Sequence, residues 1–113
     1  MMIGQMLLDE GMYGGTRIVS ADWVSESTRS HISTNNAVYF GPEYGYLWWV
    51  GEEHGHDLYF ANGYGGQFIV VVPDLDLVVV ASSAWSGMGW DAAGAQWYSV
   101  ISLIMEGILP LVE

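Results

Sequence analysis

The chain contains no cysteine and no lysine, and its two basic residues other than histidine are Arg17 and Arg29. Without cysteine there is no disulfide framework, no thiolate metal site and no thiol nucleophile. Thirteen acidic residues oppose the two arginines and give a formal net charge of -11. Binding to nucleic-acid phosphates or to an anionic membrane surface relies on clustered basic side chains, so we expect neither partner.

Charged residues make up only 13% of the chain, whereas hydrophobic residues make up 51%. This composition excludes a disordered segment and favours a well-filled core. A length of 113 residues fits a single domain spanning residues 1–113. The start lacks the basic region of a signal peptide, and polar residues or proline interrupt the apolar stretches 68–81 and 91–110. We therefore expect no leader and no membrane-spanning segment, and the compartment stays open.

The N-terminal part of the sequence predicts two helices and a loop. Apolar residues at helical spacing predict a helix over residues 2–10, which ends near Gly11. Ser20 is a typical N-cap for a second helix over residues 21–27. Residues 30–43 mix Ser, Thr, Asn, Gly and Pro without periodicity and so predict a loop.

The rest of the sequence predicts strands followed by one helix. Aromatic and β-branched residues predict strands over residues 44–50, 58–61, 67–72 and 77–81. The last two form an antiparallel hairpin that is apolar on both faces and therefore covered on both sides. A final helix over residues 92–109 is expected to start at Asp91 and to end at Pro110. The predicted fold class is α+β, an antiparallel β-sheet meander flanked by N-terminal and C-terminal helices.

Four segments carry a resemblance to a known family. They are Gln-Met-Leu-Leu-Asp-Glu-Gly at 5–11, Arg-Ile-Val-Ser-Ala-Asp-Trp-Val at 17–24, Tyr-Gly-Tyr-Leu-Trp-Trp at 44–49 and Gly-Tyr-Gly-Gly-Gln at 63–67, ahead of a valine-rich hairpin. In this order the chain resembles the C-terminal region of serine β-lactamase and penicillin-binding-protein-like hydrolases, the branch of class C β-lactamases and family VIII esterases. The resemblance implies the C-terminal part of the β-lactamase/transpeptidase-like fold.

The resemblance also implies acyl transfer on a small carbonyl substrate, with no cofactor. In that family a Ser-x-x-Lys serine attacks the carbonyl, lysine and tyrosine handle the proton, and backbone N–H groups hold the oxyanion. This sequence has neither a Ser-x-x-Lys nor a Tyr-x-Asn element. Ser33-Thr34-Asn35 has the Ser-x-Asn spacing, but we interpret it as turn chemistry. No residue is assigned a catalytic role, and the chain alone is expected to be inactive.

The family's third element, a Lys-Thr-Gly or a variant on a strand beside the site, has a counterpart here. Its position falls on Ala61, Asn62 and Gly63, with alanine in place of the charged residue. The resemblance implies that the Tyr64 N–H is an oxyanion donor and that Gly63, Gly65 and Gly66 let substrate approach the backbone. The alternative is that these glycines form a β-bulge.

Histidine and tryptophan offer further candidates. His54 and His56, beside acidic residues, have metal-compatible spacing, but no third His-rich element supports them, and a solvated hairpin tip is the simpler interpretation. His31 follows a helix end and suits a C-terminal dipole partner or plain surface. Five tryptophans could line a pocket or fill the core, and of these Trp85 and Trp90 are expected to be the most exposed.

Two functions follow for the chain. One is the C-terminal piece of a serine hydrolase that needs a nucleophile-bearing N-terminal half on another segment. The other is a stand-alone binding or assembly module derived from the same fold. Such a piece is expected to expose an open strand edge and apolar faces, and self-association into a homo-oligomer would cover them.

Overall fold

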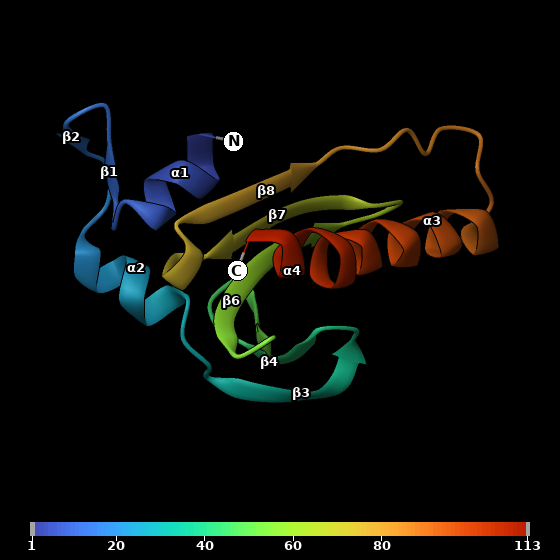
Figure 1. Ribbon diagram of the computed structural model, residues 1–113, viewed down its shortest axis with the longest axis horizontal. Coiled ribbons are helices and arrows are strands. Elements are labelled where there is room, and N and C mark those ends of the chain that lie inside the picture. Colours follow the sequence, from blue (N-terminus) through green and yellow to red (C-terminus); the bar gives the residue numbers. More distant parts are fainter. Residues whose placement is uncertain (1, 113) are drawn as a thin grey trace.

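The structure, a computed structural model, describes residues 2–112. Its main element is a six-stranded antiparallel sheet with the order β3-β4-β5-β6-β7-β8, so each strand pairs with its neighbour in the sequence. A small second sheet joins β1 (Met12–Tyr13) to β2 (Thr16–Arg17). Helices precede and follow the large sheet in the chain (Figure 1), which confirms the predicted α+β meander.

Two short helices form the N-terminal part; the first ends two residues before the predicted position 10, and the second has the predicted bounds. Helix α1 (Met2–Leu8) is closed by hydrogen bonds from the Gly11 N–H to the Met6 carbonyl and from the Glu10 N–H to the Leu7 carbonyl. Gly11 has a φ of 94°, which glycine adopts without strain. Helix α2 (Ala21–Ser27) starts at Ser20, whose Oγ accepts a hydrogen bond from the Trp23 N–H at 3.1 Å. The predicted N-cap is confirmed.

The prediction of a loop over residues 30–43 is wrong. This segment forms the outer hairpin of the sheet, β3 (Ile32–Val38) and β4 (Gly41–Tyr44). The pairing shifts register between Ser33 and Val38, where Asn35 and Asn36 adopt left-handed conformations. A bulged edge strand that is mostly exposed does not need alternating apolar residues, so periodicity gave no signal.

The prediction of one strand over residues 44–50 is also wrong. Strand β4 ends at Tyr44, and β5 (Trp49–Glu53) begins after a turn closed by a hydrogen bond from the Gly45 N–H to the Trp48 carbonyl at 2.8 Å. Gly45 packs tightly here, because a Cβ added to it would lie 2.3 Å from the Ser27 carbonyl oxygen. The aromatic run therefore bends at a glycine instead of continuing as a strand.

The central strands agree with the sequence-based prediction. Strand β6 (His56–Gly63) pairs with β7 (Gln67–Val72), which pairs in turn with β8 (Leu77–Ala81). The last two strands form the expected antiparallel hairpin, joined by the 3-10 turn η1 (Pro73–Leu75) and by Asp76 in a left-handed conformation. Runs of valine suit a strand that is buried on both faces.

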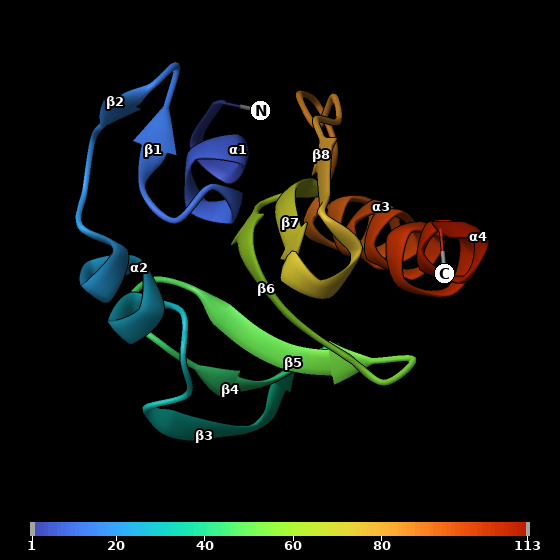
Figure 2. The ribbon, with the colours of Figure 1, turned by 60° about the vertical axis from the view of Figure 1, so that its left-hand side comes forward.

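The sheet has a buried cluster on each face, as predicted. Phe60, Phe68 and Val70 belong to one cluster, together with Ile101 and Met105 of the C-terminal helix. On the opposite face, Tyr59 and Val71 of the sheet form a second cluster with Leu7 of α1 and Val24 of α2. Figure 2 shows α1 on one side of β7 and α3 on the other. Burial of apolar area on both sides holds the helices against the sheet.

The C-terminal helix runs without a break over α3 (Trp90–Ser102), a π-helical segment η2 (Leu103–Ile108) and α4 (Leu109–Val112). It begins one residue before Asp91, and Gly89 is its N-cap. Pro110 lies inside α4, so the expectation that it ends the helix is wrong. Proline cannot donate to the carbonyl four residues earlier. Just before the proline, the hydrogen-bond pattern changes to the π-helical one, in which the Leu109 N–H bonds to the Ile104 carbonyl five residues earlier.

This 23-residue helix, Trp90–Val112, is long and apolar enough by length and composition to cross a membrane. The expectation that the chain has no membrane-spanning segment stays a prediction, because length and composition alone do not test it. Core helices of soluble proteins meet the same criteria. Here Ile101, Met105 and Leu109 pack against the sheet. In the most apolar stretch of the helix, 22% is buried inside the molecule.

Candidate functional site

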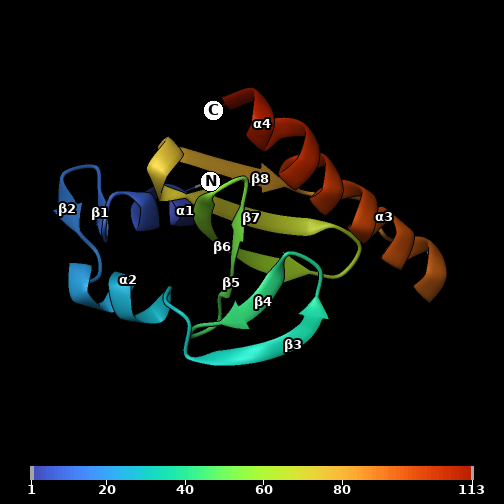
Figure 3. The ribbon, with the colours of Figure 1, turned by 60° about the horizontal axis from the view of Figure 1, so that its bottom comes forward.

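A groove with a volume of about 620 Å³ lies where three segments meet. They are the end of β3, the turn between β6 and β7, and the first turns of α3, which approach one another at one end of the sheet (Figure 3). The residues that line the groove are Ala37, Val38 and Tyr39 from the first segment, Asn62, Gly63, Tyr64 and Gly65 from the second, and Trp90, Ala93, Gly94 and Trp97 from the third. The groove is thus built by residues far apart in the sequence.

The β6–β7 turn has a backbone that requires glycine. The pairing of the two strands runs without a register shift to its last pair, Gly63 with Gln67. Gly65 and Gly66 have φ values of 78° and 102°, and a Cβ added at Gly65 would lie 2.6 Å from the Cβ of Trp85. The glycines therefore make a tight turn at the strand end and not a β-bulge.

Side chains from two other segments hold this turn in place. The Gln96 Nε2 donates to the Gly65 carbonyl at 2.7 Å, and the Ser83 Oγ donates to the Gly66 carbonyl at 2.9 Å. The Gln67 side chain donates to the Ser83 carbonyl and accepts from the Ser83 N–H, at 2.5 and 3.1 Å. The turn is thus fastened to α3 and to the loop after β8, which keeps its N–H groups in fixed positions.

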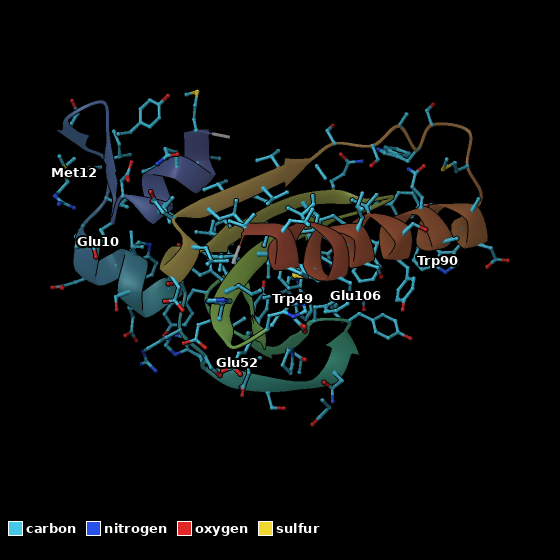
Figure 4. All side chains as sticks on the ribbon, viewed as in Figure 1. Glu10, Met12, Trp49, Glu52, Trp90 and Glu106 are labelled. Carbon is cyan, nitrogen blue, oxygen red and sulfur yellow. The ribbon has the colours of Figure 1, made fainter. Side chains whose placement is uncertain are left out.

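Aromatic rings form much of the groove surface. The ring centroids of Tyr64 and Trp90 are 5.7 Å apart, and those of Tyr39 and Trp97 are 6.5 Å apart. The Trp97 Nε1 donates to the Asn62 Oδ1 at 2.5 Å and so ties the helix to the end of β6. Trp90 is 79% exposed at the start of the helix (Figure 4). The site therefore offers large apolar faces with few polar atoms.

The predicted substrate-binding wall is only partly brought together. Asn62, Gly63, Tyr64 and Gly65 line the groove, but Gly66 is buried behind them against Ser83 and Val100. Ala61 pairs with Ile69 and lines a second cavity of about 290 Å³, to which Asn62 and Gly63 also contribute. Neighbouring residues of a strand face opposite sides, so the two predicted motif positions, Ala61 and Asn62, point to different faces of the sheet.

Several groove residues were missed by the sequence analysis. Tyr39 lies between β3 and β4, in the segment interpreted as loop, and nothing local connects it with α3. Gly94 lies in the middle of an otherwise regular helix, and an isolated helical glycine is a signal of close packing or function. That signal was present in the sequence and pointed to this face of the helix.

The histidine pair does not form a shared site. The His54 Nε2 is 3.0 Å from the Met105 carbonyl, whereas the His56 Nδ1 is 3.3 Å from Asp74 Oδ2. Within residues 2–112, no cluster of three or more histidine, aspartate or glutamate side chains is arranged to hold a metal ion. Burial raises the pKa of the neighbouring Glu53; His54 opposes this shift, whereas Glu106 and Glu52 add to it. The two histidines instead tie the β5–β6 hairpin to the C-terminal helix and to the β7–β8 connection.

The remaining candidates have structural partners. The Ser33 Oγ accepts from the Asn35 N–H at 3.2 Å, which is the turn chemistry expected for this triplet, although the triplet lies in a bulged strand. His31 contacts the Glu26 carbonyl at the end of α2 and stacks on Tyr46. Trp48 and Trp49 pack against the two buried clusters, while Trp85 is 49% exposed, as expected.

Comparison with known protein families and with curated proteins finds no match for this chain. The structure itself defines an α+β protein with a preformed aromatic groove at one end of its sheet. The groove provides backbone groups of a fixed turn, one amide side chain and aromatic faces. Its lining contains no charged residue.

Proposed function

We propose that the chain is the substrate-binding part of an acyl-transfer serine hydrolase, with the nucleophile supplied by a segment outside these 113 residues. In this proposal the carbonyl group of an ester or amide lies against the end of β6, and the Tyr64 N–H donates to its oxygen. The groove between Tyr64, Trp90 and Trp97 holds the apolar part of the substrate. The resemblance of the sequence segments to serine β-lactamase-related hydrolases motivates the reaction class.

One observation carries this proposal. The turn to which the resemblance assigns the oxyanion wall lies on the groove of about 620 Å³, and its backbone is fixed by hydrogen bonds from Gln96 and Ser83. An oxyanion donor acts through preorganisation, because it does not have to move when charge develops. The second cavity, beside Ala61 on the other face, leaves the strand end accessible from both sides of the sheet.

The same residues argue against catalysis by the chain alone. A serine needs a neighbouring base or a lowered pKa to attack a carbonyl, and the sequence has no lysine. Both arginines are engaged elsewhere, since Arg29 pairs with Glu26 and Arg17 donates to the Glu10 and Val19 carbonyls. The expected activity is therefore binding without acylation.

Two experiments on the purified chain test these statements. Treatment with a fluorophosphonate probe followed by mass spectrometry should show no serine adduct. Titration with a short-chain ester, followed by the backbone amide signals in NMR, should shift Tyr64 and Gly65 while Gly14 and Gly55, at the tips of two distant turns, stay unchanged. A serine adduct, or shifts that avoid the β6–β7 turn, would contradict the proposal.

A second candidate function, a homo-oligomeric assembly module, is favoured by the edge of the sheet. Within residues 2–112, β8 pairs with β7 on one side and with no strand on its other side. Its sequence, Leu-Val-Val-Val-Ala, carries no charge, and Val80 is 38% exposed. Uncharged edges are prone to pair with another chain. Light scattering should then detect a dimer or larger assembly that the Val80→Lys variant dissociates, whereas a monomeric wild-type chain at micromolar concentration would exclude it.

A further inference from the structure

We infer that the groove selects substrates whose leaving group or acyl chain carries a positive charge, such as an alkylammonium or trimethylammonium group. This inference rests on the proposed function, because it names the class of ester or amide that the same groove would take. It is drawn from the rings that line the groove and from the distribution of charge over the molecule.

The aromatic rings are placed to contact one cation together. A cation is attracted to the face of an aromatic ring when it lies within about 6 Å of the ring centroid. Tyr64 and Trp90 have centroids 5.7 Å apart and planes tilted by 38°, and both line the groove, so one cation in the groove can lie within this distance of both rings. Tyr39 and Trp97 provide a second pair in the same groove.

The charge of the protein favours a cation in the groove and opposes an anion. None of the residues that line it is charged, and Asp91 follows Trp90 in the first turn of α3. Arg17 pairs in register with Met12, which Figure 4 shows at the opposite end of the molecule from Trp90. Arg29, just after α2, forms an ion pair with Glu26. A net charge of -11 therefore acts on a bound ligand without a nearby basic residue to offset it.

Small residues leave room for such a group. Ala93 and Gly94 lie on the helix between the aromatic residues Trp90 and Trp97, and a Cβ added at Gly94 meets no atom within 4 Å. A trimethylammonium group has the shape of a tert-butyl group, and aromatic rings recognise such quaternary ammonium groups. A longer side chain at position 94 would occupy this space.

A pair of esters of equal shape tests the inference. Acetylcholine and 3,3-dimethylbutyl acetate differ only in the charged nitrogen that replaces a carbon atom. Their affinities are measured by titration of the chain, followed by the indole N–H signals of Trp90 and Trp97 in NMR, with the signal of Trp23 as a reference outside the groove. We expect the cationic ester to bind about three- to fivefold more tightly. Hydrophobicity alone would favour the neutral ester.

Two variants assign the effect to the groove. In Trp90→Leu the apolar contact is kept while the ring face is lost, so the ratio of the two affinities should fall toward one. Trp23→Leu removes a tryptophan that is also exposed, at 52%, but lies on α2 outside the groove, and it should leave the ratio unchanged. Both positions are on the surface, so neither replacement is expected to unfold the chain.

The outcomes separate this inference from the proposed function. A preference for the cationic ester that disappears in Trp90→Leu supports it. If the neutral ester binds as tightly or more tightly while the groove signals still shift, the inference is wrong and the proposed function stands. If neither ester shifts the groove signals, both are wrong.

Discussion

Gly94 and Gly65 both line the groove, but their backbones differ. Gly94 lies inside α3, where a Cβ would meet no atom within 4 Å. Glycine in a helix is about 0.8–1 kcal/mol less favourable than alanine. Gly94→Ala should therefore raise the free energy of unfolding by about 0.5–1 kcal/mol, measured by urea denaturation. A loss of stability would contradict the open space that the structure shows at this position.

Gly65→Ala is the matched replacement in the turn and should act in the opposite direction. Gly65 has a φ of 78°, and the added Cβ would lie 2.6 Å from the Cβ of Trp85. A left-handed conformation costs alanine about 1–2 kcal/mol, to which the close contact adds. The urea midpoint should fall clearly below that of the wild type. Unchanged stability would mean that the turn does not require glycine.

Tyr59 makes stability depend on alkaline pH. Burial raises the pKa of its phenol to about 12, whereas an unfolded tyrosine has a pKa of about 10. Below pH 10 the Tyr59 phenol is protonated in both the folded and the unfolded chain, so its contribution to the free energy of unfolding is fully present. Between about pH 10 and pH 12 the unfolded chain loses the proton first, and the free energy of unfolding falls. Tyr59→Phe should show a shallower fall in urea midpoints over this range, and an equally steep one would contradict the assignment.

The stability of the short helix α2 depends on its N-cap. Ser20 satisfies the Trp23 N–H, and Val24 is the apolar residue of α2 that the structure buries. Ser20→Ala should lower the free energy of unfolding by about 1 kcal/mol. Ser25→Ala, an exposed position within the same helix, serves as the control and should be neutral or slightly stabilising. Equal effects of the two replacements would argue against a specific cap.

The elements that the sequence predicted correctly are those with strong local signals. Helix caps at Ser20 and Gly11 and the valine runs of β7 and β8 depend on nearby residues alone. The polar edge strand β3 was missed because an exposed strand has no apolar period to detect. The prediction that Pro110 ends the helix was wrong because the residues before it form a π-helical segment, which local sequence does not indicate.

The candidate site was predictable to a similar extent. Glycines at 63, 65 and 66 marked the turn because positive φ and close packing favour that residue. The opposing wall could not be predicted, since Tyr39 and Trp97 meet only after the sheet and the C-terminal helix have formed. That the side chains of Ala61 and Asn62, the predicted motif positions, point to opposite faces follows only from the pairing of β6 as a strand.

At the scale of the whole molecule, excess negative charge opposes folding. Two arginines face thirteen acidic residues, and the formal net charge is -11. Compact states with high net charge are destabilised by self-repulsion, which salt screens over a Debye length of about 10 Å at 0.1 M. The melting temperature should rise when sodium chloride is increased from about 0.02 M to about 0.3 M. A melting temperature that falls over this range would show that attractive ion pairs dominate.

The arrangement of the whole molecule places the groove where three parts of the chain meet. The sheet is covered on both faces, and the β6–β7 turn, the end of β3 and the start of α3 lie together at one end (Figures 1 and 3). A site that depends on three segments should be lost when the chain unfolds and be present whenever it is folded. Binding is thus expected to follow the folded fraction.

A crystal structure of the chain with a bound short-chain amide is the most direct measurement of the central claim, which is that the β6–β7 turn receives a carbonyl group. The account predicts the amide in the groove beside Trp90 and Trp97, with its carbonyl oxygen about 2.7–3.1 Å from the Tyr64 nitrogen. An amide bound elsewhere on the molecule, with the groove left to solvent, would contradict it.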